Sequence, residues 1–149
     1  MPTTECNPSE FPFDALFSRE VVGRFDGGQI TSDGGGLLLR EVERRPHILQ
    51  RLADCFRHYR VADRIEPSVR ELICQRVYAW VLGYEDLNDH EPLRADPLLA
   101  VLAGQRDPAG QDRKQERERG TALAGKSRLN RWELTRAEAP PSKNAMPRS

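Results

Sequence analysis

EPSVRELICQRVYAWVLGYEDLNDHEPLR, residues 66–94, is the stretch that decides the fold. Ser68 is followed three residues later by Glu71, which is the spacing of a capping box at the start of a helix. Gly83 stands where a left-handed C-terminal cap needs a residue without a Cβ. Between them, apolar residues recur at the spacing of one helix face: Val69, Leu72, Ile73, Val77, Trp80, Val81 and Tyr84. The pattern predicts a helix whose apolar face forms the centre of the core.

Two shorter helices are predicted after the central one. Asp86 can cap a short helix that runs to about Arg94. Asp96-Pro97 then starts another, because proline at the first turn loses no hydrogen bond there. Gly104 ends that helix. Further along the chain, Ser127 is predicted to cap a last short helix, which contains Leu129, Trp132 and Leu134.

The residues before the central helix indicate a hairpin and two helices. Residues 20–31 predict two short strands around Asp26-Gly27-Gly28, because Asp-Gly favours a tight hairpin turn. Asp33 or Ser32 can cap a helix that Pro46 ends. Residues 47–60 predict an amphipathic helix with one apolar face: Leu49, Leu52, Phe56 and Tyr59.

The glycines at 34–36 allow two interpretations. A glycine-rich loop at a helix start can cradle a phosphate, but this one lacks the Lys-Ser/Thr of a P-loop and the spacing of a dinucleotide fingerprint. The structural alternative is a tight turn whose backbone packs too closely for side chains, and we prefer it. A nucleotide-binding enzyme that uses Asp33 to Gly36 is kept as a further alternative function of the chain.

Composition limits the class of protein. The 149 residues carry 38% hydrophobic and 31% charged side chains, with 23 basic and 23 acidic residues. The zero net charge excludes a strongly basic nucleic-acid footprint over the whole chain. The basic residues are unevenly spread, with eight Arg against five acids in residues 40–70 and six Lys or Arg against two Glu in residues 120–149. Arginine suits bidentate phosphate contact, although a genome of high GC content would also enrich it.

Cysteine and hydropathy patterns indicate a cytoplasmic protein. Cys6, Cys55 and Cys74 are odd in number and lack metal-ligand spacing. The last two lie in helical patterns, so we expect buried free thiols. No apolar run approaches the roughly 20 residues of a membrane span, and no signal peptide is evident.

Asp86, Asp89, His90 and Glu91 are close enough in sequence to suggest a metal site. Acidic residues at a helix start are explained equally well by capping and by the helix dipole. We prefer the capping interpretation.

We therefore expect a mainly α fold, a small helical domain with a short N-terminal β-hairpin and disordered ends. The expected parts are a flexible lead-in (1–18), a helical domain (19–104), a charged exposed loop (105–120), a short helical segment (121–136) and a disordered tail (137–149).

Three motifs resemble a known family. The first is Thr31-Ser32-Asp33-Gly34-Gly35 with residues 37–41, and the second is Gln75-Arg76-Val77-Tyr78 with residues 82–90 and the Leu93-Arg94-x-Asp96-Pro97 that follows. The third is Gly125-Lys126-Ser127 with Leu129-Asn130-Arg131. In order and spacing they resemble the N-terminal region of DDE transposases of the insertion-sequence thirteen-eighty family, over about residues 20–135. Arg128 and Trp132 depart from that likeness, as does the chain from about Pro141.

The resemblance implies DNA transposition by a family that cuts and joins DNA with three carboxylates and two divalent metal ions, Mg²⁺, on a ribonuclease-H-like core. That core follows the third motif, so we expect a truncated and catalytically inactive fragment with no catalytic residue and no cofactor of its own. Asp33, Asp86 and Asp89 do not match the family's catalytic motif and receive no catalytic role.

The expected residual activity is salt-sensitive binding of DNA at the ends of the element. The candidate DNA-binding residues are Arg51, Arg57, Arg60, Lys126, Arg128 and Arg131. The alternative is a non-enzymatic protein-interaction module that self-associates or docks on intact transposase through apolar surface. Size-exclusion chromatography with and without DNA distinguishes the two.

Overall fold

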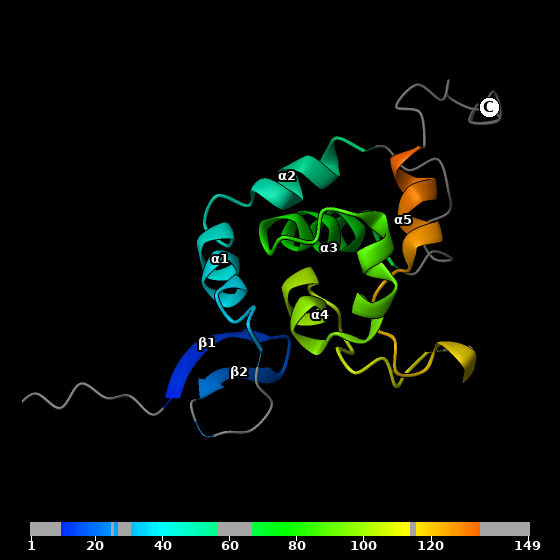
Figure 1. The fold of residues 1–149 in the computed structure, drawn as a ribbon. Helices are drawn as coiled ribbons and strands as arrows, with labels where there is room; N and C mark the ends of the chain where they lie inside the picture. The colour runs from blue at the N-terminus through cyan, green and yellow to red at the C-terminus, as the bar shows by residue number, and fades with distance from the viewer. Residues whose placement is uncertain (1–9, 25, 27–30, 57–66, 114–115, 135–149) are drawn as a thin grey trace, which may run out of the picture.

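The structure, a computed structural model, describes residues 10–24, 26, 31–56, 67–113 and 116–134. Helix α3 lies at the centre, with α2, α4 and α5 around it, and the β-hairpin and α1 lie at one side (Figure 1). In chain order the elements are β1 (Glu10–Leu16), β2 (Arg19–Arg24), α1 (Gly36–Glu43), α2 (Ile48–Asp54), α3 (Val69–Val81), η2 (Leu87–His90), η3 (Pro92–Ala95), α4 (Pro97–Ala103), η4 (Glu116–Glu118) and α5 (Lys126–Glu133). The predicted mainly α fold with an N-terminal hairpin is confirmed.

Both ends of α3 form as the sequence predicts. The Ser68 hydroxyl accepts from the Glu71 N–H at 3.2 Å, and the Glu71 carboxylate accepts from the Ser68 N–H at 2.6 Å. Gly83 adopts φ +96°, and the Tyr84 N–H donates to the Ala79 carbonyl at 2.8 Å. This closes the helix in a Schellman motif, which satisfies carbonyls that the last turn leaves open.

The buried face of α3 differs from the predicted one near its C-terminal end. Trp80 is 49% exposed and Val81 is 58% exposed, whereas the polar Gln75 and Arg76 are buried. The prediction was wrong here because apolar periodicity takes no account of polar partners from elsewhere in the chain. Gln75 and Arg76 have such partners, so burying them leaves few hydrogen bonds unmade.

The hairpin forms from a different pair of segments than the sequence predicts. Strand β2 pairs antiparallel with the preceding strand β1, with Phe13 opposite Val21. Residues 10–16, expected to be part of a flexible lead-in, are therefore a strand. The turn between β1 and β2 falls at Phe17, which adopts φ +55°. Most of the expected turn at Asp26-Gly27-Gly28 and of the strand expected after it, residues 27–30, lies outside the described residues.

Arg40 of α1 fixes the hairpin to the helices. Its side chain is buried and donates to the carbonyls of Asp14 at 2.7 Å and Ala15 at 3.2 Å. A guanidinium can saturate several carbonyls at once, so one residue ties the end of β1 to α1.

Helix α1 begins without the predicted side-chain cap. Gly35 is the N-cap residue, and the Asp33 carboxylate binds elsewhere. A Cβ on Gly36 would lie 2.6 Å from the Leu102 side chain of α4. A side chain at Gly36 would therefore require Leu102 to move, whereas a Cβ on Gly35 would meet nothing within 4 Å, so the turn is crowded at Gly36 and open at Gly35.

Helix α2 is shorter and more exposed than predicted. It ends at Asp54, and residues 57–60 lie outside the described part of the chain. Leu49 is buried as expected, but Leu52 and Phe56 are 41% and 42% exposed. Cys55, expected to be buried, is exposed, whereas Cys74 is buried as predicted.

The later segments follow the predicted boundaries closely. Asp86 caps η2 and Asp96 caps α4, whose C-cap Gly104 has φ +79°. Helix α5 differs, because Gly125 is its N-cap with no side-chain hydrogen bond, so Ser127 is not the cap. The residues predicted as an exposed loop include η4 and the buried Gln105 and Gly110.

Residues of α3 contribute to two core clusters. The larger includes Ile73, Cys74 and Leu99, and the smaller consists of Leu72, Ala124 and Leu129 under α5. Within the described residues, no helix combines the length and the apolar composition that a membrane span requires.

Candidate nucleic-acid interface

The second and third sequence motifs meet in a buried polar network at Gln75. The Gln75 side chain donates from Nε2 to the Ala124 carbonyl at 2.8 Å and accepts at Oε1 from the Ala124 N–H at 3.0 Å. Both residues are 1% exposed. This pair of hydrogen bonds satisfies the buried N–H and carbonyl of Ala124, as pairing in a β-sheet would. Ala124 comes directly before Gly125, the N-cap residue of α5.

His90 is the centre of the same network and is fully buried. Its Nδ1 lies 3.1 Å from Gln75 Nε2, and its Nε2 lies 3.1 Å from Arg76 Nη1. Arg76 also pairs with Glu133 of α5, Nε to Oε1 at 2.8 Å, and lies over the Trp80 ring at 4.7 Å. Burial and the Arg76 charge lower the pKa of His90 below its usual value.

Smaller contacts join the remaining motif residues. The Tyr84 hydroxyl donates to the Asp33 carboxylate at 2.8 Å, which connects the first motif to the second and raises the pKa of Tyr84. Lys126 Nζ donates to Asn88 Oδ1, which connects the second to the third. The three motifs therefore form one contiguous scaffold, and several of their polar residues serve the packing of the chain.

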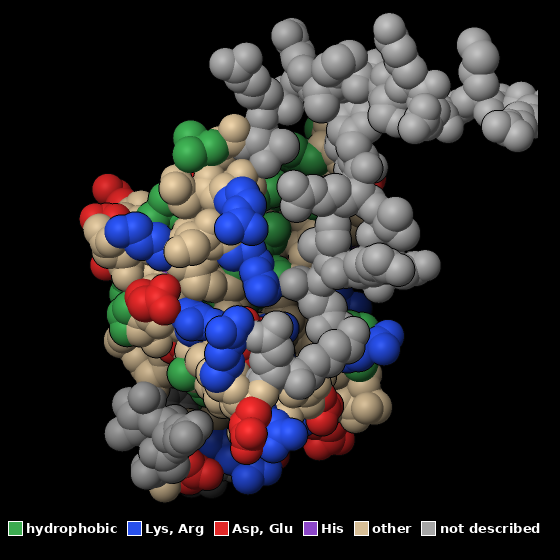
Figure 2. All heavy atoms as spheres, turned by 90° about the vertical axis from the view of Figure 1, so that its right-hand side faces the viewer, with side chains coloured by type: hydrophobic (Ala, Val, Ile, Leu, Met, Phe, Trp, Pro, Cys, Tyr) green, Lys and Arg blue, Asp and Glu red, His purple; other side chains and the backbone are tan. Residues whose placement is uncertain are grey.

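The scaffold presents an exposed basic face on α5. Lys126, Arg128 and Arg131 are exposed, and all three are predicted DNA-binding residues. Figure 2 shows the side of the molecule where α5 lies, with lysine and arginine side chains along its middle and carboxylates toward its edges. Of the nearby acids, Glu133 is paired with Arg76, and Glu118 lies 4.0 Å from Arg128. On an ideal helix Arg128 and Arg131 lie about 60° apart, and Lys126 lies about 160° from Arg128. The three cations are therefore spread around the exposed side of a short helix, where they can contact phosphates of a duplex.

Arg51, the predicted DNA-binding residue on α2, is exposed and lies in the last turn of that helix. Just beyond the helix, the Phe56 ring packs on the Trp132 ring of α5 with centroids 5.5 Å apart. The C-terminal side of α2 therefore lies against α5, which brings two predicted basic segments together. Arg57 and Arg60 lie outside the described residues.

Two further arginines join this surface that the sequence did not single out. Arg117 and Arg119, in and beside η4, are exposed, and η4 is adjacent to α5 through Glu118 and Arg128. The alternating charges of residues 112–119 indicate only a solvated segment when seen in sequence. Their nearness to α5 depends on tertiary structure, so local sequence gave no signal for it.

The residues at 86–91 that suggested a metal site form helix-capping hydrogen bonds, an ion pair and part of the buried network. Asp86 accepts from Asn88 N–H at 2.8 Å, and Asp89 accepts from Asp86 N–H at 3.2 Å. The hydrogen bonds from Asn88 lower the pKa of Asp86. Glu91 binds Arg94 at 3.2 Å, and His90 points into the network. In the part of the chain that the structure describes, no three His, Cys, Asp or Glu side chains could together hold a metal ion.

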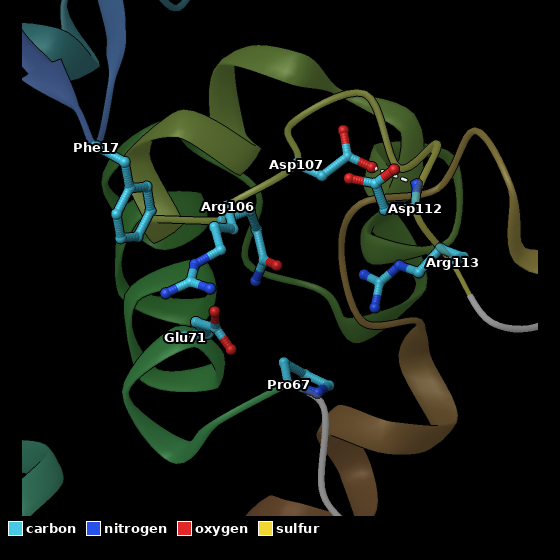
Figure 3. Close-up of a pocket in the computed structure, with 8 residues that line it drawn as sticks. Phe17, Pro67, Glu71, Arg106, Asp107, Asp112 and Arg113 are labelled. Atoms are coloured by element: carbon cyan, nitrogen blue, oxygen red, sulfur yellow. Dashed lines mark hydrogen bonds between the residues drawn. The ribbon is translucent and has the colours of Figure 1, made fainter.

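A cavity of about 460 Å³ lies between the hairpin turn, the start of α3 and the residues after α4 (Figure 3). Its charged groups are mixed in sign and largely occupied by contacts within the chain. Arg113 donates to the carbonyls of Thr121, at 3.0 Å, and Ala122, and Arg106 lies over the Phe17 ring at 5.4 Å. Three carboxylates line it against two guanidiniums, so it does not fit a phosphate group. The lining residues are Phe17, Pro67, Glu71, Gln105, Arg106, Asp107, Asp112 and Arg113.

Comparison with protein families identified a family to which the chain belongs by the length of the match. The profile described as "Transposase DDE domain group 1" matches residues 13–146. The matched range includes every described element from the middle of β1 to α5. Searches of curated proteins and of solved structures gave no match.

Proposed function

Because the chain belongs to the family of group 1 transposase DDE domains, its role is in DNA transposition, and we propose that it holds DNA and does not cut it. The observation that carries this proposal is the exposed basic face of α5, fixed to α3 by the buried network at Gln75. Membership of a transposase family makes DNA the expected partner, and the face offers the cations that backbone contact requires.

The described carboxylates support a holding role. Family chemistry uses three carboxylates and two metal ions. The Asp33 carboxylate accepts a hydrogen bond from the Tyr84 hydroxyl, and Asp86 and Asp89 form the capping box at the start of η2. These groups stabilise the chain itself and do not fit a pair of metal ions. The proposal therefore assigns strand cleavage to a separate catalytic core.

We also propose that the chain is of the insertion-sequence thirteen-eighty type. The support is that the three motifs on which this likeness rests make direct contacts: Tyr84 with Asp33, Gln75 with Ala124 beside Gly125, and Lys126 with Asn88. Motifs that fold onto one another are expected of a shared scaffold.

The test is DNA binding by a variant with Lys126, Arg128 and Arg131 all changed to Gln. Fluorescence anisotropy with a labelled duplex measures affinity across a salt titration. Each phosphate contact contributes about 0.9 to the log–log salt slope, so we expect the slope to fall by up to about 3 in this variant. Adding Arg51→Gln should lower it further.

The control changes Arg19, Arg24 and Arg45 to Gln, which removes three exposed cations on the hairpin and α1 side. It should retain most of the slope. Equal loss in the two variants would mean that binding is non-specific to the whole surface, and the assignment of α5 would be wrong. Cleavage of the duplex in Mg²⁺ or Mn²⁺ that EDTA abolishes would contradict the holding role.

A second candidate function is protein–protein contact, either self-association or docking on an intact transposase. Large apolar side chains on α1, α2 and just beyond are exposed by 41 to 67%: Leu38, Val42, Ile48, Leu52 and Phe56. Exposed apolar surface marks interaction sites. Size-exclusion chromatography without DNA distinguishes the functions, because concentration-dependent oligomers with no DNA affinity would favour the second.

A further inference from the structure

The hydrogen-bond partners of His90 are unusual because both are donors. The Gln75 amide cannot turn round, since its oxygen and nitrogen are both committed to the Ala124 backbone. It therefore presents an N–H to His90 Nδ1. A guanidinium has donors only, so Arg76 presents another N–H to His90 Nε2.

A neutral imidazole can accept one of these two hydrogen bonds, and a protonated ring can accept neither. Protonation would therefore place two N–H groups of the ring against two N–H groups of its partners, at a residue that is fully buried. Such a contact is costly because each buried donor loses its acceptor.

Charged groups from three elements act on the ring. Arg76 of α3 opposes protonation, whereas Asp89 of η2 and Glu133 of α5 favour it. Burial and Arg76 together outweigh the two carboxylates, and the pKa of His90 lies below its usual value. The neutral ring is therefore the form that the fold selects near neutral pH.

The network reaches both ends of α5. Gln75 binds Ala124, directly before the N-cap residue Gly125, and Arg76 binds Glu133, the last residue of the helix. The ring lies between Gln75 and Arg76. Displacing either partner would loosen one attachment of the helix to α3.

We propose that Gln75 and His90 are positioning residues for the DNA-contacting face of α5, and that this positioning requires a neutral His90 ring. The proposal rests on the proposed function, because it concerns the same face of α5. It adds a regulation of that face, since acidification releases α5 and weakens DNA binding.

The direction of this effect is opposite to that of simple electrostatics. Protonating exposed histidines adds positive charge, which should strengthen DNA binding as the pH falls. Here the anisotropy assay on the full chain should show affinity falling between about pH 7.5 and about pH 5.5, as protonation is coupled to undocking. The fall should be at most about tenfold, because that is the largest shift that one histidine with an ordinary pKa in the undocked state can give over this range.

The variant His90→Gln tests the mechanism. The glutamine side chain can accept a hydrogen bond through its amide oxygen and does not titrate. The DNA affinity of this variant should therefore no longer fall as the pH is lowered. His47→Asn is the matched control, because His47 is exposed with φ +50° and asparagine tolerates that conformation. The control should keep the wild-type profile. Affinity that rises or stays constant toward low pH in the wild type, or an unchanged fall in His90→Gln, would overturn the proposal.

Hydrogen exchange of the α5 amides separates this proposal from the function on which it rests. If the wild type binds no DNA at any pH, the proposed function fails, but the protection of residues 126–133 still tests the positioning. Protection lost on acidification in the wild type and retained in His90→Gln supports it. Equal protection in both at every pH overturns it.

Discussion

Gly110 lies where two loops of the chain touch. It adopts φ +66°, and a Cβ there would lie 2.6 to 2.8 Å from backbone atoms of Thr121 and Ala122. Gly120 has a similar φ of +79°, but a Cβ there would meet nothing within 4 Å. Alanine substitution at both positions costs the left-handed conformation, but only at Gly110 does it also cause crowding. Comparing the two variants therefore isolates the free-energy cost of the crowding.

We expect Gly110→Ala to lower the free energy of unfolding by about 1–3 kcal/mol more than Gly120→Ala, because backbone cannot move aside as a side chain can. Both variants carry the left-handed penalty of roughly 1–2 kcal/mol. Urea denaturation measures the difference. Equal losses would show that the loop around residue 110 shifts freely away from residues 121–122.

At the scale of elements, the same serine signal occurs at two helix starts and only one forms a cap. Ser68 accepts the Glu71 N–H, whereas the start of α5 shows no side-chain cap hydrogen bond. Ser68→Ala should therefore lower the free energy of unfolding by about 1 kcal/mol. Ser127→Ala should change it by less than about 0.5 kcal/mol, as expected of an exposed position. A thermal or urea unfolding series compares them, and similar losses would mean that Ser127 caps α5 in solution.

Features set by neighbouring residues were predictable from the sequence. The capping box at Ser68, the left-handed Gly83 and the Asp96 cap each depend on residues within a few positions. The hairpin was not, because its turn at Phe17-Ser18 carries no glycine or proline signal, and the Asp-Gly pair at 26–27 suggested another turn.

The candidate interface was predictable only in part. Lys126, Arg128 and Arg131 were identified from the sequence and are exposed on one helix. The buried roles of Gln75 and His90 were missed, because the partner of Gln75 lies 49 residues away. A polar residue on an apolar helix face has no local sign of such a partner.

The whole molecule is organised so that the centre of α3 is reached only by separating several elements. Cys74 is 1% exposed in the larger cluster, and α3 packs against α2 and α4. Burial raises the pKa of its thiol to about 11. The thiolate, which is the reactive form, is therefore scarce as well as shielded.

Labelling with a thiol reagent tests this organisation. In a Cys6→Ser background, Cys55 should react rapidly, whereas Cys74 should react only at the rate of global unfolding. A second variant that also carries Cys55→Ser isolates the Cys74 signal. Fast labelling of Cys74 under native conditions would show that α2 or α4 separates from α3 without global unfolding.

The long-range attachments of α5 also bear on the order in which the protein is made. Gln75 cannot form its hydrogen bond until Ala124 has been synthesised. Arg76 cannot pair until Glu133, 57 residues later, has been synthesised. Closing such long loops costs entropy that only the completed contacts offset, and the N-terminal part of a chain is synthesised first. On a translating ribosome, the core around α3 and α4 can therefore form before α5 has been synthesised and can dock on it. A nascent chain would lack the basic face, and nucleic acid close to the ribosome would meet it only after translation has passed the last turn of α5.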